Sequence, residues 1–449
     1  MKQNIYILLS IALVILIVGG VVAWGMGEFN HGRILNPERM LRADSVINHA
    51  IAQGDFPGAV LCVVAKAEDG ESMGDLLYLK SYGYRQLTSG RDAVSGELKT
   101  DTIPMTTDAV FDLASMSKCV GTTLSFMRVL EDGYVRLTDN VNRYIPDFDP
   151  WESKPEKRGE KPEKRHITIK DLLTHTSGLP AYIGVDNFVE QMQRHGKTEG
   201  LALRDSLISF IADSERVKRL SAPSEEYRYS CLNMIVVQAI IERVTGQRLD
   251  HYARQEVFSK LGLKNTWYNC IDDANRPYGE DTPIVPTELQ ASGKVLRGEV
   301  HDPLARVANR GVSGNAGLFS SASDLAVIAS VLMNGGVIRL PKDGWSGKVG
   351  GGELRRIFSK QTIDRFFTIP EGYEAHGRAL GWDFDGTNGD LLSPNRVASH
   401  TGYTGTSIAI DLDLGVSIIL LTNRVHPKDT GGVARTRNVV SNIVAAALE

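Results

Sequence analysis

The chain has 449 residues, of which 42% are hydrophobic and 23% are charged, and its formal net charge is −4. This length allows a large hydrophobic core in one large domain or two closely packed ones, and the composition excludes a disordered, collagen-like or coiled-coil chain. A pI near 6.2 without a dominant basic stretch indicates that nucleic acid is not a partner. The four cysteines are too few for a disulfide scaffold and form no C-x-x-C pair, so no zinc ribbon is expected.

An uncharged apolar run of 20 residues occupies positions 5–24. As a helix it would be about 30 Å long, which is enough to cross a membrane once. Lys2 precedes the run and Glu28 follows it, an asymmetry that keeps the N-terminus in the cytoplasm. The run exceeds the apolar part of a signal peptide, which favours an uncleaved anchor and leaves a cleaved signal peptide as the alternative. We therefore expect a cytoplasmic segment at 1–4, a transmembrane anchor or signal segment at 5–24, a linker at 25–37, and one domain outside the cytoplasm, periplasmic or extracellular, at 38–449.

The beginning of that domain combines helical and strand patterns. Residues 37–53 have apolar residues at helical spacing and are followed by Gly54, which is typical of a helix end. Two β-branched apolar runs at 58–66 and 76–84 predict a β-hairpin. Residues 112–132 return to helical spacing.

The end of the domain shows the same two patterns. An amphipathic helix is predicted over 232–240, ending near Gly246. Two strands at 407–411 and 416–422 form a second hairpin, and a closing helix covers 434–448. Strands near both ends with helices between them predict an α+β fold, in which an antiparallel sheet unites the first and last strands under a helical middle. Exposed loops are expected at 151–165, which holds KPEKR twice, and at 347–352, which is rich in glycine.

A serine and a lysine stand three residues apart in the segment FDLASMSK, as Ser115 and Lys118. A serine hydroxyl becomes a strong nucleophile when a base removes its proton. On a helix the lysine lies one turn along on the same face, and burial can remove its charge so that it acts as that base. A backbone N–H at the helix start could also bind an oxyanion. The alternative is that Ser115 caps the helix and Lys118 is a surface residue.

Two further groups of residues could act with this pair. Tyr229, two residues before Cys231, precedes the amphipathic helix, and a tyrosine hydroxyl beside cations can transfer protons. His400, Thr401, Gly402 and Tyr403 lead into the closing hairpin, where they could line a substrate groove that the glycine lets the backbone approach. The alternatives are a half-buried structural tyrosine and an ordinary polar turn.

The order and surroundings of these motifs resemble those of the serine β-lactamase-related family, which includes class C β-lactamases, low-molecular-weight penicillin-binding proteins and many esterases. The resemblance covers about residues 40–448. It implies a β-lactamase/transpeptidase-like fold, an α/β sandwich with an all-helical subdomain. The segments that carry it are FDLASMSK, LEDGYVRLTDNVNRYIPDF, ITIKDLLTHTSGLP, APSEEYRYSCLNMIVVQAIIERVTG, LGLKNTWY, VHDPLARVANRGVSGNAGLFSSASDLAVIASVLMNGG, LGWDF and SHTGYTGTSIAIDLDLGVSIILLTNRVHP.

The resemblance implies a role for each motif residue. Ser115 corresponds to the acylated nucleophile, Lys118 to its proton partner and Tyr229 to the general acid/base. The backbone N–H groups of Ser115 and Tyr403 would form the oxyanion hole. His400, Thr401 and Gly402 correspond to the third motif, which lines the substrate site. The family gives His175, in HTSGLP, a structural role.

Two positions depart from the family pattern. Cys231 replaces the usual Asn or Asp, which removes a side-chain amide that contacts substrate. His400 replaces lysine, and an imidazole with an unperturbed pKa near 6.5 is mostly neutral at pH 7. We therefore expect a preference for uncharged acyl groups, with carboxylate binding that improves below about pH 6.5 provided that burial does not shift the pKa of His400. The alternative is that an arginine elsewhere in the cleft holds the carboxylate.

Together these features predict a serine hydrolase that forms an acyl-enzyme on an ester or a peptide-like amide, such as a cell-wall peptide with D-amino acids. The alternatives are a β-lactamase and a catalytically quiet penicillin-binding scaffold or sensor. No G-x-S-x-G or H-E-x-x-H motif occurs, which argues against an α/β-hydrolase or a zinc peptidase. No cofactor or metal ion is expected; the partners are a small-molecule or peptide substrate and, through residues 5–24, the membrane.

Overall fold

The structure is a computed structural model that describes residues 33–155, 160–194, 196, 200–340, 352–384, 388–429 and 431–449. Residues Leu35–Glu449 form one compact unit, and a second unit, Met1–Ile34, lies almost entirely outside the described residues. The apolar run at 5–24 is also outside them. Among the residues that are described, no helix is both long enough and apolar enough to cross a membrane.

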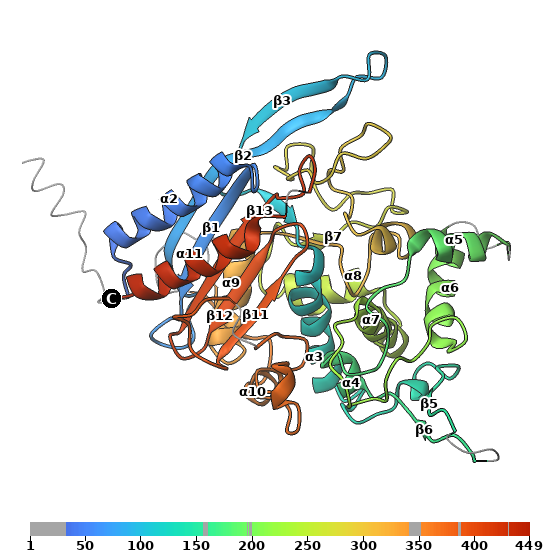
Figure 1. The fold of residues 1–449 in the computed structure, drawn as a ribbon. Helices are drawn as coiled ribbons and strands as arrows, with labels where there is room; N and C mark the ends of the chain where they lie inside the picture. Colours follow the sequence, from blue (N-terminus) through green and yellow to red (C-terminus); the bar gives the residue numbers. More distant parts are fainter. Residues whose placement is uncertain are drawn as a thin grey trace, which may run out of the picture. The chain divides into compact units, whose positions relative to one another are not determined.

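An antiparallel sheet of six strands, counted over the described residues, forms the centre of the compact unit (Figure 1). Its strand order is β11-β12-β13-β1-β2-β3, so the first and last strands of the chain meet as predicted. Leu61 of β1 lies opposite Leu420 of β13, and Cys62 lies opposite Leu79 of β2. The strands are β1 (Gly58–Ala65), β2 (Asp75–Arg91), β3 (Leu98–Pro104), β11 (Val397–Thr401), β12 (Ser407–Asp411) and β13 (Val416–Thr422).

Helices cover both faces of this sheet. Figure 1 shows α2 and α11 side by side on one face, with α9 on the other. Smaller sheets hold the remaining strands, in the orders β4-β8-β7, β10-β9 and β5-β6. The helices are α2 (Pro37–Gln53), α3 (Leu124–Glu131), α4 (Ile169–Leu173), α5 (Val185–Arg194), α6 (Gly200–Ala212), α7 (Cys231–Thr245), α8 (Leu249–Ala253), α9 (Ala322–Met333), α10 (Lys360–Phe366) and α11 (Val433–Ala447). The short strands are β4 (Val110–Asp112), β5 (Trp151–Glu152), β6 (Lys164–Arg165), β7 (Trp267–Tyr268), β8 (Leu318–Ser321), β9 (Val337–Arg339) and β10 (Leu354–Arg356).

The alternation of side chains along β1 explains why both faces are covered. Leu61 and Val63 belong to a buried apolar cluster shared with α2 and α11. Val60 and Val64 belong to the larger cluster that includes α9 and the helices α3, α4, α7 and α8. Successive strand residues point to opposite faces, so a strand without polar residues must be buried on both. This is the α+β arrangement that the sequence predicts.

The predicted helix over 112–132 begins later and is less regular than its spacing indicates. Residues Val110–Asp112 form β4, and the helix then starts as a 3-10 turn, η1 (Ala114–Met116). A π-helical turn, η2 (Lys118–Thr123), follows before α3. The Asp112 carboxylate accepts hydrogen bonds from the backbone N–H groups of Ala114 (2.8 Å) and His301 (2.7 Å), which fixes the strand end next to the helix start.

The ends of the compact unit lie together. The backbone N–H of Asn36 donates to the carbonyl of Ala447 at 2.8 Å, and Leu35 forms a β-bridge with Leu448. At another edge, the hairpin of β2 and β3 projects away from the sheet (Figure 1), and Val94 near its tip is 97% exposed.

The expected loop at 151–165 contains the short pair β5 and β6, with residues 156–159 outside the described part of the chain. Of the expected loop at 347–352, all but residue 352 also lies outside it.

Candidate active site

Ser115 lies in the 3-10 turn that follows β4 and is half-buried. The preceding residue, Ala114, has φ of +45°, a left-handed conformation that costs a non-glycine residue about 1–3 kcal/mol. Its N–H is held by Asp112, so the surrounding structure keeps this conformation in place. Ser115 lines a cavity of about 420 Å³ together with Tyr229, His400, Thr401, Gly402, Tyr403 and other residues. Six of the eight predicted site residues therefore share one cavity wall.

Lys118 lies directly behind the serine and is buried, with 1% of its surface exposed. Its Nζ donates to Ser115 Oγ at 2.8 Å and to the carbonyl of Asn315 at 2.9 Å. The centroid of the Tyr229 ring lies 5.0 Å from the same Nζ. The geometry contradicts the alternative of a surface lysine.

Burial and the neighbouring side chains act in opposite directions on the pKa of Lys118. Burial alone lowers its pKa, but the electrostatic influence of Cys231 and Tyr229 raises it, and the net direction of the pKa is upward. A raised pKa favours the ammonium form of Lys118, which donates to Ser115. Tyr229, whose ring centroid lies 5.0 Å from Lys118 Nζ in the same cavity wall, is a candidate for the group that takes the serine proton.

Tyr229 precedes α7 and is fixed by His175. The His175 ring packs against the Tyr229 ring with centroids 4.8 Å apart. Its Nδ1 accepts from the backbone N–H of Ser230 (3.2 Å) and lies 3.0 Å from Nδ2 of Asn233, which assigns the proton to Nε2. Burial and the nearby cations Arg378 and Lys118 hold the pKa of His175 well below its usual range. His175 is thus a neutral side chain that anchors the start of α7.

The third motif is joined to the strand end that precedes Ser115. Thr404 Oγ1 donates to the carbonyl of Asp112 at 2.7 Å, and Thr406 Oγ1 donates to that of Leu113 at 3.0 Å. A Cβ at Gly402 would lie 2.2 Å from Thr406 Oγ1 and 2.3 Å from the carbonyl of Leu113, so only glycine fits there. The expected close backbone approach at this glycine is present.

His400 lies on β11 and is buried. Its Nδ1 is 2.8 Å from the carbonyl of Thr401, which can only accept, so Nδ1 carries the proton and Nε2 remains an acceptor. Burial, together with Lys118 and Arg378, lowers the pKa of His400 to about 3. The expected improvement in carboxylate binding below pH 6.5 required a pKa that burial does not shift, and a pKa of about 3 does not meet that condition.

Positive charge in the cavity comes instead from residues that the motifs did not indicate. Arg378, Arg424 and Arg437 line the same cavity as Ser115. Arg424 stacks on the Tyr403 ring at 4.6 Å, and Arg437 donates to the carbonyls of Gly402 (3.2 Å) and Thr406 (3.0 Å). These two arginines hold the turn of the third motif. Burial and the charge of Arg424 lower the pKa of Arg437 to about 10, which still leaves it charged at neutral pH.

Arg378 has a different environment. Its guanidinium lies 5.8 Å from the centroid of the Tyr229 ring and forms an ion pair with Asp383 at 2.8 Å. It also lies 5.2 Å from the centroid of the Tyr227 ring, and it forms a β-bridge with Asp383. In the sequence, Arg378 stands three residues before Gly381 of the LGWDF segment. This proximity to a motif is too weak to identify Arg378 as a site residue.

Cys231 is the first residue of α7, is half-buried and is a free thiol. It does not line the cavity that holds Ser115, although its charge would act on Lys118. Thr401, in contrast, is exposed in the cavity wall.

One group of side chains in the described part of the chain has the composition of a metal site: Asp250, His251 and Asp273. The guanidinium of Arg248 already pairs with both carboxylates, at 2.7 and 2.5 Å, and so occupies the position that a cation would take. None of these residues lines the cavity of Ser115.

Comparison with known proteins agrees with this geometry. The family model described as Beta-lactamase matches residues 43–441. An N-acetylmuramyl-L-alanine amidase of Bacillus subtilis is 30% identical over 89% of this chain and 86% of its own length. An Escherichia coli protein provisionally named D-alanyl-D-alanine carboxypeptidase is 28% identical over 87% of this chain and 83% of its own length. Among solved structures, EstCE1, a hydrolase with promiscuous acyltransferase activity, aligns with a TM-score of 0.61 and 22% identity over 91% of this chain and 98% of its own.

The family model spans most of the compact unit, including all three motifs and the helices that position them. The solved structure supports the fold alone at its level of identity, whereas the family model and the B. subtilis relative establish membership. On these grounds the chain belongs to the β-lactamase family and is a serine hydrolase of that family.

Proposed function

We propose that the protein is an extracytoplasmic hydrolase that opens a peptide-like amide or an ester through an acyl-enzyme on Ser115. The observation that carries the proposal is the 2.8 Å contact between Lys118 Nζ and Ser115 Oγ in the wall of a cavity that Tyr229 also lines. A hydroxyl held by an ammonium group, with a phenol beside both, is an arrangement in which a serine can be activated.

In the proposed mechanism Tyr229, as a phenolate stabilised by the Lys118 ammonium, takes the proton of Ser115. The oxygen then attacks the substrate carbonyl, and the oxyanion is bound by the backbone N–H groups of Ser115 and Tyr403. The C–N or C–O bond breaks as Tyr229 returns the proton to the leaving group. A water molecule attacks the acyl-enzyme in the same way and releases the acid.

The proposed substrate class is a peptide that carries a carboxylate, such as a cell-wall stem peptide with D-amino acids. Three arginines line the cavity, and Arg378 is the one placed beside Tyr229. A guanidinium binds a carboxylate through two parallel hydrogen bonds. The names of the relatives from B. subtilis and E. coli both describe amide bonds to alanine, which supports this class without assigning it.

The proposed location follows from the sequence. An uncharged run at 5–24 after Lys2 would anchor the protein in the membrane, with the compact unit in the periplasm or outside the cell. The predicted domain boundary at residue 38 belongs to the same proposal.

The test of the mechanism is labelling of the full-length protein with a fluorophosphonate and with a fluorescent penicillin, followed by mass spectrometry of the adduct. We expect the adduct on the peptide that contains Ser115 and no labelling of Ser115→Ala. An adduct on Ser117 or Ser177 would contradict the assignment, and no adduct at all would favour a catalytically quiet scaffold.

The test of the substrate class compares a D-alanyl-D-alanine peptide, nitrocefin and p-nitrophenyl butyrate. Arg378→Gln should lower kcat/KM for the carboxylate peptide about 10- to 100-fold, because a hydrogen bond to a charged group contributes about 1.5–3 kcal/mol. The neutral ester is the internal control and should change little. Equal losses on both substrates would remove Arg378 as the carboxylate ligand, and preferred turnover of nitrocefin would instead indicate a β-lactamase.

A further inference from the structure

The loop of residues 309–315 lies behind the candidate catalytic pair. Its Asn315 carbonyl accepts from Lys118 Nζ at 2.9 Å, and its Gly314 carbonyl accepts from Thr122 Oγ1 at 2.8 Å. The position of this loop therefore sets the position of the Asn315 carbonyl, which is one of the acceptors that hold the Lys118 ammonium group beside Ser115.

Gln238, on α7, binds this loop with both ends of its side-chain amide. Its Nε2 donates to the carbonyl of Val312 at 3.0 Å, and its Oε1 accepts from the N–H of Gly314 at 2.8 Å and from Asn309 Nδ2 at 3.2 Å. The side chain is buried, with 3% of its surface exposed. An apolar replacement would leave these backbone and amide groups without a partner in a place that water does not reach.

The loop itself is closely fitted to α7. A Cβ at Gly314 would lie 2.0 Å from the carbonyl of Met234, so the loop backbone touches the helix. Within the loop, Ser313 Oγ accepts from Asn309 Nδ2 at 2.7 Å and donates to Asn315 Oδ1 at 2.6 Å. Hydrogen bonds to the Gly314 N–H and to the Asn315 side chain thus hold the loop next to the carbonyl that receives Lys118.

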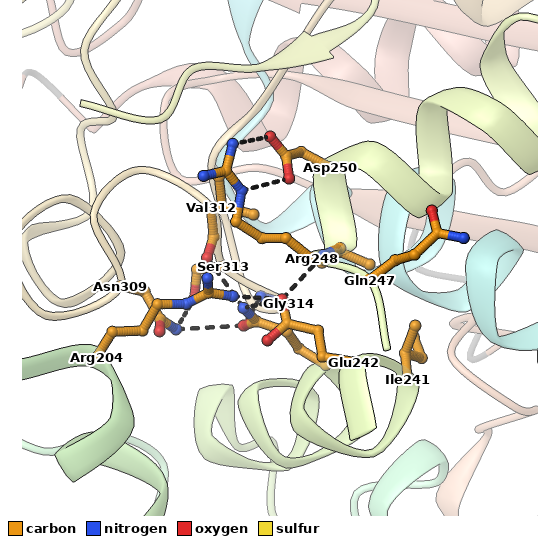
Figure 2. A network of polar contacts seen from close by, with 12 residues as sticks. Arg204, Ile241, Glu242, Gln247, Arg248, Asp250, Asn309, Val312, Ser313 and Gly314 are labelled. Carbon is orange, nitrogen blue, oxygen red and sulfur yellow. Dashed lines mark hydrogen bonds and ion pairs between the residues drawn. The ribbon is translucent and has the colours of Figure 1, made fainter. Parts of the chain in front are cut away.

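Figure 2 shows Glu242 close to the loop residues Asn309 and Gly314. Glu242, one turn after Gln238, accepts from Gln238 Nε2 at 3.2 Å and from the backbone N–H of Leu249 at 2.9 Å. It also pairs with Arg204 of α6. These contacts hold the glutamine in one orientation.

We propose that Gln238 is a positioning residue for Lys118, acting through the 309–315 loop. The proposal deepens the proposed function, because it rests on acylation of Ser115 with Lys118 as the partner. On this proposal α7 positions two groups of the site. The start of the helix holds Tyr229, and Gln238 in its third turn holds the loop whose Asn315 carbonyl accepts from Lys118. A small displacement of a catalytic group can lower a rate about 100-fold. The loss of the hydrogen bonds between Gln238 and the loop should therefore lower the rate of acylation more than the affinity for substrate or inhibitor.

The test is the rate of fluorophosphonate acylation of the full-length protein, separated into the inactivation rate constant and the inhibitor dissociation constant. Gln238→Leu should lower the rate constant about 10- to 100-fold and change the dissociation constant little. In a Lys118→Ala background the same substitution should have almost no further effect on the rate constant, because the group that it positions is absent.

Gln86→Leu is the matched control. Gln86 is also buried and donates to Asp101, but it lies on β2 and does not line the cavity of Ser115. It should lower the melting temperature with a near-normal acylation rate. Should Gln238→Leu fail to fold, Ser313→Ala should show a smaller loss in the same direction.

An unchanged acylation rate in the folded variants would overturn the proposal, and so would an equal loss in the presence and absence of Lys118. Failure of wild-type Ser115 to be labelled would instead contradict the proposed function itself.

Discussion

The ammonium group of Lys118 is buried between a serine hydroxyl, a backbone carbonyl and a tyrosine ring. No carboxylate pairs with it among the ion pairs of the described residues. Such a charge is stable only if its neighbours can share its proton or accept hydrogen bonds from it. Lys118 and Tyr229 should consequently behave as one proton-transfer unit.

This coupling predicts non-additive mutational losses. Lys118→Ala and Tyr229→Phe should each lower kcat about 100- to 10,000-fold, which is the range for the loss of a general acid or base. The double variant should be little worse than the poorer single variant. Steady-state kinetics on p-nitrophenyl butyrate measure this, and losses that multiply would show that the two residues act independently.

The lowered pKa of His400 predicts that the stability of the protein depends on pH. Its pKa is about 3 in the folded protein and near 6.5 in the unfolded chain, so between these values only the unfolded chain binds the proton. The free energy of unfolding should therefore fall as the pH falls below 6.5, by at most about 1.4 kcal/mol per pH unit from this residue.

Urea denaturation of wild type and His400→Gln between pH 7 and pH 4 isolates this contribution, because the other buried histidines are common to both proteins. The variant should lose stability less steeply than wild type. Equal slopes would mean that His400 titrates normally in the fold, which would restore it as a charge-sensing residue.

Individual residues show where prediction from the sequence reached its limit. Ser115, Tyr229 and His400 were indicated by local motifs, and the fold brings them into one cavity. Arg378 was not, because an arginine acquires this place only through the packing of its segment against Tyr229. The pKa of His400 could likewise be predicted only on the condition that burial leaves it unshifted, since it depends on burial and on cations distant in sequence.

At the scale of elements, the turn between β11 and β12 is fitted to the strand end before Ser115 through Gly402. Gly402→Ala would force this turn away from Leu113, and overpacking of this kind costs about 1–3 kcal/mol. We expect the variant to be less stable and its acylation rate to fall about 100-fold, since the turn carries Tyr403.

Gly184→Ala is the matched control for this change. No atom lies within 4 Å of the position that a Cβ would take at Gly184. Melting temperature and acylation rate should both remain close to those of wild type. Similar losses in the two glycine variants would show that the fit at Gly402 has no special role.

Elements with a strong local signal were predicted closely. The strands at 407–411 and 416–422 have the predicted bounds, and α2 and α7 end at Gly54 and Gly246 in left-handed conformations. The helix predicted over 112–132 was less accurate, because Val110–Asp112 pairs with β8, a strand about 200 residues later in the chain. Such long-range pairing overrides local spacing and leaves no trace in the segment itself.

At the scale of the whole chain, the compact unit begins at Leu35, after the apolar run. Full-length protein should be recovered in the membrane fraction with Met1 as its first residue, whereas a variant lacking residues 1–27 should be soluble and active. Cell fractionation, N-terminal sequencing and labelling of Ser115 measure this. A mature N-terminus near Trp24 would show a cleaved signal peptide instead of an anchor.

The contact between Asn36 and Ala447 also has a topological consequence. Because the two ends of the unit are adjacent, a short Gly/Ser linker from Glu449 to Leu35 would close the chain into a ring without moving any strand. The ring could be opened between Val94 and Ser95, at the exposed tip of the β2–β3 hairpin. This circular permutant should fold and be acylated on Ser115 at a rate within several-fold of wild type, and an insoluble or inert product would mean that the order in which β1 and β13 are synthesised matters for folding.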